Sequence, residues 1–108
     1  MATTYKVLGQ LNPTAGSLQT LYTVPAATSA VTSTLTICNQ STATNVRVAI
    51  RPGGASIDPK HYVVYDSVVN ANDTMFLTIG GTLATTDVVS VYAGTANVSF
   101  NLFGSELT

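Results

Sequence analysis

The side chains that could do acid–base or nucleophilic chemistry are few. His61 is the only histidine and Cys38 the only cysteine. A histidine acting as a general base needs a nucleophile within hydrogen-bond reach and a third group to orient it. The chain contains no nucleophile motif such as G-x-S-x-G. We therefore interpret His61 as a structural strand histidine beside Lys60 and Tyr62, and we predict no catalytic residues and no enzyme.

The carboxylates do not form an obvious ligand set for a metal. Asp58, Asp66, Asp73 and Asp87 fall one to each loop or strand end, whereas a metal site needs several ligands that converge at suitable spacing. Asp is also a common turn residue, because its side chain can bond its own backbone. The sequence predicts no metal and no cofactor, and calcium held between two loops is the alternative.

Tyrosine and arginine are the remaining candidates for a binding role. Five tyrosines are present and no tryptophan. Aromatic faces can stack on sugars, but tyrosines more often cap cores or fill interfaces between proteins. In the stretch HYVVYD, Tyr62 and Tyr65 are the best candidates for an interface, although strict alternation places them on opposite faces of their strand. Arg47 and Arg51 share the polar face of another strand and complete the predicted interface.

The elements that must position these residues are β-strands. Residues 45–51, NVRVAIR, alternate branched side chains with polar or small ones, which puts both arginines on one face. In residues 29–39, SAVTSTLTICN, the odd-numbered positions from Val31 to Ile37 are predicted to share a face. A polar segment joins the two stretches, so we predict a hairpin whose apolar face packs against a second sheet.

The whole chain follows this pattern of short strands and turns. β-branched residues dominate the periodic segments, and no segment has convincing helical spacing. The sequence therefore predicts a single all-β domain over residues 1–108, an antiparallel β-sandwich of about eight strands with immunoglobulin-like or jelly-roll topology. The expected strands cover residues 2–11, 17–25, 29–39, 45–51, 60–69, 74–81, 88–94 and 96–104.

Composition excludes several classes of function. Charged residues make up 8% of the 108 residues, against about 25% in typical globular domains. With a net charge of −1 and no basic run, the chain is not expected to bind nucleic acid. No apolar run is long enough for a membrane span, no secretory signal is visible, and a single cysteine fits a reducing cytoplasm. An uncharged Thr/Ser/Asn/Gly surface suits packing against copies or partners, and a neutral soluble domain is the alternative.

Three runs carry a resemblance to a known class of proteins. They are LYTVPAATSAVTSTLTICNQS, KHYVVYDSVVNANDTMFLTIGGTLATTDVVSVYAG and NVSFNLFGSE. Together, over residues 18–106, they resemble small β-sandwich structural proteins of tailed bacteriophages, which are found on capsids, collars and fibres. The matching motifs are turns and core positions, so the resemblance implies a structural role and no catalytic residues.

The resemblance implies a protein of the virion, assembled in the cytoplasm of a bacterial host. The leading expectation is a capsid decoration or cement protein that binds the major capsid protein, as a homo-oligomer with a trimer favoured. The alternative is a tail, collar or head-fibre module that contacts the host surface and binds a glycan. A small hydrolase is the third interpretation, and it lacks the paired acid–base or nucleophile residues that it would need.

Overall fold

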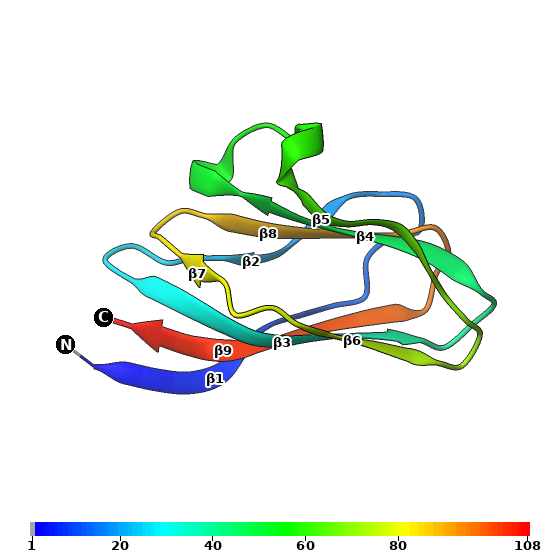
Figure 1. Cartoon of the computed structure of the whole chain (residues 1–108), viewed down its shortest axis with the longest axis horizontal. Helices are drawn as coiled ribbons and strands as arrows, with labels where there is room; N and C mark the ends of the chain where they lie inside the picture. The colour runs from blue at the N-terminus through cyan, green and yellow to red at the C-terminus, as the bar shows by residue number, and fades with distance from the viewer. Residues whose placement is uncertain (1) are drawn as a thin grey trace.

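Two antiparallel β-sheets stacked face to face form the structure, a computed structural model that describes residues 2–108 (Figure 1). The strands are β1 (Thr3–Leu11), β2 (Gln19–Thr23), β3 (Ser29–Asn39), β4 (Thr44–Arg51), β5 (Tyr62–Val69), β6 (Thr74–Thr78), β7 (Thr82–Leu83), β8 (Val88–Ala93) and β9 (Val98–Leu107), with 3-10 turns η1 (Pro52–Gly54) and η2 (Pro59–His61). Sheet A has the strand order β1-β9-β3-β6, with β7 also pairing β3, and sheet B has the order β2-β8-β4-β5. The predicted β-sandwich is confirmed.

The strand order identifies the topology as a jelly roll. An immunoglobulin sandwich pairs its first strand with its second, whereas here β1 pairs with β9 and β2 lies in the other sheet. Apart from β7, each sheet holds four strands, and consecutive strands pair only at β4 and β5. This is the double-sheet arrangement of the jelly roll. The termini leave the molecule side by side at one end, from β1 and β9 (Figure 1).

The predicted hairpin over residues 29–52 is wrong. The first arm is β3 in sheet A and the second is β4 in sheet B, so residues 40–43 cross between the sheets. The crossing is fixed by Asn39, whose buried side chain bonds the backbone of this connection and of Val69 and Asn70 at the end of β5. Alternation describes each arm but carries no information on which sheet it joins.

A β-bulge in β3 overturns the predicted sharing of a face by its odd-numbered residues. The ladder between β3 and β9 slips between Thr32 and Thr34, and one extra residue reverses the direction of every side chain beyond it. Leu35 and Ile37 are therefore buried between the sheets, whereas Val31 lies on the outside and Thr32 is buried. The bulge was invisible in the sequence because the residue at its centre is an ordinary Ser33.

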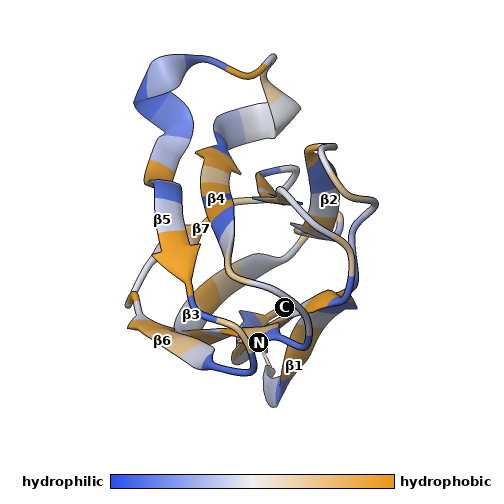
Figure 2. Cartoon of the chain, turned by 90° about the vertical axis from the view of Figure 1, so that its right-hand side faces the viewer, coloured by the Kyte–Doolittle hydropathy of each residue, from blue (hydrophilic) through white to orange (hydrophobic). Residues whose placement is uncertain are grey.

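The core lies between the inner faces of the two sheets. In β4 the predicted alternation is confirmed, because Val46 and Val48 are buried against sheet A while Arg47 points outward. Phe100, near the start of β9, is the largest fully buried side chain. Burying branched side chains from both sheets contributes most of the stability, since each contributes about 1.5–3 kcal/mol relative to exposure. Figure 2 shows the two layers end-on, with β6, β3 and β1 below β5, β4 and β2.

A polar trio spans the two sheets beside this core. The hydroxyl of Tyr22 donates to Oε2 of Glu106 at 2.6 Å, and Nζ of Lys6 lies 3.3 Å from Oε1. The hydrogen bond from Tyr22, reinforced by Lys6 and opposed by burial, lowers the pKa of the Glu106 carboxyl. Burial, then the hydrogen bond and charge of Glu106, raise the pKa of the Tyr22 phenol. The trio thus favours an ionised glutamate beside a protonated tyrosine.

We expect this trio to make stability fall at both extremes of pH. The pKa of Glu106 is lower in the folded state, so its contribution is complete above its unfolded pKa of about 4.3 and is lost as pH falls through the folded value. The pKa of Tyr22 is raised, so its contribution is present below pH of about 10 and is lost as pH rises further.

Thermal melts of the wild type and Glu106→Gln test the expected loss of stability in acid. The difference in Tm should be steady near neutrality and shrink as pH falls below the unfolded pKa of Glu106. A difference that persists undiminished in acid would contradict this account, and Asp73→Asn is the matched surface control.

Candidate functional site

The outer face of sheet B carries a stack of aromatic and charged side chains. The guanidinium carbon of Arg47 lies 4.4 Å from the ring centroids of both Tyr65 and Tyr92, its direct neighbours on the two flanking strands. Nε and Nη2 of Arg47 donate to the two carboxylate oxygens of Asp66 at 2.6 and 3.2 Å. Cation–π contacts and a forked ion pair thus fix the guanidinium. The tyrosine cluster is defined as Arg47, Tyr62, Tyr65, Asp66 and Tyr92.

A β-bulge at Val63 brings Tyr62 and Tyr65 to the same face of β5. The ladder between β4 and β5 slips at Val63 and again at Asp66, and each slip resets the alternation of side chains. The prediction that the two tyrosines face opposite ways is therefore wrong. Their ring centroids are 4.9 Å apart, with an angle of 78° between the rings. An edge-to-face pair of this kind is the favoured geometry for two aromatic rings.

The backbone of Asp66 is part of the same arrangement. Its φ of 55° lies in the left-handed region, which Asp tolerates better than most residues but which still costs energy. Asn45 donates a second hydrogen bond, at 2.9 Å, to the oxygen that accepts from Arg47 Nε. These hydrogen bonds, the one from Arg47 first, lower the pKa of the Asp66 carboxyl. The ion pair that supports Tyr65 therefore persists into acidic solution.

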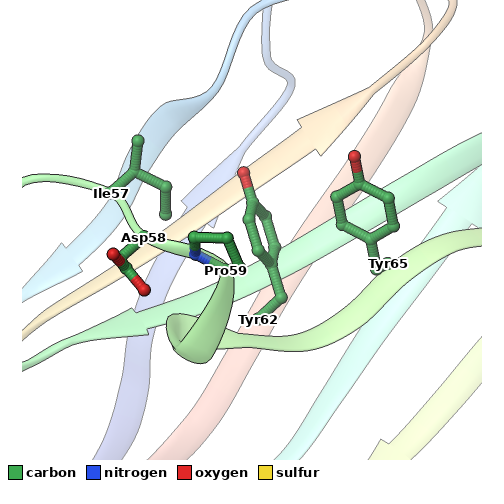
Figure 3. Close-up of a pocket in the computed structure, with 5 residues that line it drawn as sticks. All are labelled: Ile57, Asp58, Pro59, Tyr62 and Tyr65. Atoms are coloured by element: carbon green, nitrogen blue, oxygen red, sulfur yellow. The ribbon is translucent and has the colours of Figure 1, made fainter.

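A shallow cleft lies beside the tyrosine cluster, on the side of the loop that joins β4 to β5. It has a volume of about 470 Å³ and is lined by Ile57, Asp58, Pro59, Tyr62 and Tyr65. Figure 3 shows both tyrosines pointing the same way with their hydroxyls outermost, and the Asp58 carboxylate pointing away from those hydroxyls. Asp58 instead caps η2, since Oδ1 accepts from the backbone N–H of Lys60 at 3.2 Å. The accessible chemistry of the cleft is therefore aromatic and aliphatic.

The remaining predicted residues support this loop. Arg51 does not join the cluster: its guanidinium donates to the carbonyls of Ala55 and Gly54 at 2.8 and 3.2 Å and to Ser90 Oγ at 3.1 Å. His61 is buried and ends η2, where its Nδ1 accepts from the backbone N–H of Asp58 at 3.0 Å. The prediction of a strand histidine is therefore corrected to a residue of a 3-10 turn, and its role is to hold the loop.

The outer face of sheet A is a second surface, which the sequence interpretation did not single out. It bears several exposed apolar side chains, with Tyr5 84% and Phe76 70% exposed. The only charged residues in the strands of this sheet are Lys6 and Glu106, and both belong to the inner side, where Glu106 meets Tyr22 of sheet B. The signal in the sequence was the near absence of charge from five strands. The apolar face is defined as Tyr5, Val7, Val31, Phe76 and Phe103.

Within residues 2–108, no three His, Cys, Asp or Glu side chains group closely enough to hold a metal ion. Over the same range, no helix has the length and apolar character needed to cross a membrane. No family model matches the chain, and no curated protein is similar to it in sequence.

Proposed function

We propose that this protein is a non-enzymatic structural protein of a virion, a capsid decoration or cement protein that binds the major capsid protein through the tyrosine cluster. The observation that carries the proposal is the rigid group formed by Arg47, Tyr62 and Tyr65 on the outer face of sheet B. Tyr and Arg are the residues most enriched at the energetic centre of protein interfaces. Here they are held in place before binding, which lowers the entropy lost on association.

The remainder of the chain suits this role. Jelly rolls recur in viral capsid proteins, although the fold alone does not specify a function. A cement protein acts by covering joints between capsid subunits, so many small interfaces together oppose the pressure of packaged DNA. A surface with little charge permits copies to sit side by side on a capsid lattice. We expect a homo-oligomer, with a trimer suggested by the resemblance to phage proteins, assembled in the bacterial cytoplasm and located on the virion.

A tail, collar or head-fibre module that binds a host glycan is the second candidate. The cleft beside Tyr62 and Tyr65 favours it, because a volume of about 470 Å³ is within the range of small-molecule sites. Exposed phenol rings can stack on the apolar face of a sugar ring. A glycan array probed with the labelled chain tests this candidate, and an array without binding that depends on Tyr65 would count against it.

The capsid role is tested by adding the purified chain to expanded and to unexpanded capsids of the source phage. Cosedimentation should show saturable binding to expanded capsids, with a stoichiometry that follows the number of major capsid subunits. Binding should be retained at high salt, because the proposed contact depends on aromatic packing more than on exposed charge. Failure to bind expanded capsids at any concentration would refute the role.

A further inference from the structure

The outer face of sheet A carries exposed apolar side chains interspersed with hydroxyl and amide side chains. The ladder places Tyr5 opposite Ser105 and Ser105 opposite Val31, in one row across β1, β9 and β3. The next row places Val7 opposite Phe103 and Phe103 opposite Thr34. Phe76 stands further along the sheet on β6, opposite Thr36. Neighbouring side chains in such rows are within contact distance of each other. Tyr5, Val7, Phe103 and Val31 therefore form one patch, and Thr34 and Thr36 on β3 lie between this patch and Phe76.

This face is unusual for the outside of a soluble sandwich. An antiparallel sheet normally packs one face on the core and presents polar and charged side chains on the other. Here the outward side chains are aromatic, aliphatic, hydroxyl or amide groups, and Lys6 and Glu106 are directed inward. Contiguous exposed apolar patches on soluble proteins mark interaction sites. We therefore expect a partner to cover this surface.

The absence of charge indicates what kind of partner fits. Interfaces between different proteins are selected largely by complementary charge and polar groups, which exclude wrong partners. The apolar face has no charged side chain with which to make that selection. Its free energy of association is therefore most favourable against a surface that is equally uncharged. The same face of another copy meets this condition, since two neutral faces meet without repulsion and without burying an unpaired charge.

The size of the face also fits association between copies. The two sheets are stacked along the vertical axis of both Figures 1 and 2, so the plane of sheet A contains the longest and the shortest axes of the molecule. The whole chain extends 44 and 19 Å along these axes. A standard interface covers about 800 Å² on each partner, so a contact of standard size would use most of this side of the molecule.

We propose that the outer face of sheet A is the surface through which copies of this chain associate with one another. Tyr5 on β1 and Phe76 on β6 are its most exposed contacts and lie on the two outer strands of the sheet, with Phe103 on β9 and Val31 on β3 between them. This leaves the tyrosine cluster, on the opposite side of the sandwich, free to contact a different protein. The inference does not depend on the capsid role, because self-association is measured with the purified chain alone.

The test is sedimentation velocity and equilibrium on the full chain over a range of concentrations, for the wild type and for the double variant Tyr5→Thr/Phe76→Thr. Threonine keeps β-propensity and is already common on this face. The wild type should form a defined oligomer, and the double variant should raise its dissociation constant about a hundredfold. The control is Val63→Thr/Val68→Thr, which removes two exposed apolar side chains from β5 of sheet B and should leave association unchanged. Circular dichroism and melting curves establish that each variant is folded.

A second readout uses the only thiol of the chain. Cys38 is partly exposed and is paired with Thr74 and Ser99, on the outward side of sheet A. Its reaction with a disulfide reagent should slow as wild-type concentration rises and should not slow in the double variant. A wild type that stays monomeric at every concentration would overturn the proposal. So would association that is equally strong in the double variant, because copies would then meet through another surface.

Discussion

Replacing Tyr62 and Tyr65 by serine is expected to weaken binding to expanded capsids by about a hundredfold or more. Both rings belong to the tyrosine cluster, and Tyr65 is 59% exposed although one of its faces is held by Arg47. Truncating a central aromatic residue commonly costs about 2–4 kcal/mol of binding free energy. The fold should be unaffected, because neither ring belongs to the core. The measurement is cosedimentation with capsids at increasing concentrations of each variant.

The matched control for this experiment is Val68→Ser. Val68 lies opposite Asn45 on the same sheet and is 64% exposed, but it is outside the tyrosine cluster. Its substitution should change capsid affinity by no more than about twofold. Arg47→Lys gives an intermediate case, because lysine keeps the charge but loses the forked contact with Asp66 and the flat stack between two rings. If the double tyrosine variant binds capsids as well as the wild type, the cluster is not the capsid-binding surface.

Asn39→Ala is expected to destabilise the fold by about 3–5 kcal/mol. Asn39 is 1% exposed. Its Nδ2 donates to the backbone carbonyls of Thr42, Val69 and Asn70 at 2.8, 3.1 and 3.2 Å, and its Oδ1 accepts from the N–H of Ser41 at 3.0 Å. Alanine would leave these backbone groups without partners at the point where the chain crosses between sheets. The free energy of unfolding in urea measures the effect.

The nearly isosteric Asn39→Asp separates hydrogen bonding from packing. A carboxylate would face the same three carbonyl oxygens with no proton to donate, so at neutral pH this variant should be at least as unstable as Asn39→Ala. Part of the loss should be recovered in acid, where the carboxyl is protonated and can donate once. Gln40→Ala is the control, because Gln40 is exposed and bonds only outside the core, and it should stay within about 0.5 kcal/mol of the wild type. A loss below about 1 kcal/mol in Asn39→Ala would show that water replaces the amide without cost.

The alternation in β4 could be predicted because nothing interrupts it within the strand. Val46 and Val48 lie on the same face of β4, and the alternation alone places both side chains in the core. In β5 the same reasoning fails at Val63 and Asp66, since each adds a residue to one side of the ladder. A bulge depends on the register with a neighbouring strand, so a single strand's sequence does not reveal it.

The sequence predicted three members of the candidate site and missed Asp66 and Tyr92, which topology and a bulge bring to Arg47. Tyr62, Tyr65 and Arg47 were singled out by residue type, and the structure places them side by side. Arg51 was chosen for the same reason, but its three hydrogen bonds to the 54–55 backbone and to Ser90 assign it to loop support. The contacts of Asn39 with Val69 and Asn70 join residues about thirty positions apart. Contacts between residues so far apart in the sequence depend on the order of strands in the sheets, which the local pattern of residue types does not encode.

The copy number of this protein in purified particles tests the virion role most directly. Quantitative mass spectrometry of particles from the source phage gives the ratio of this chain to the major capsid protein. The account predicts hundreds of copies per particle, in a fixed proportion to the capsid subunits. A few copies, in multiples of three or six, would assign the protein to the tail, collar or a fibre and contradict the cement role. Absence from the particle would contradict the virion role altogether.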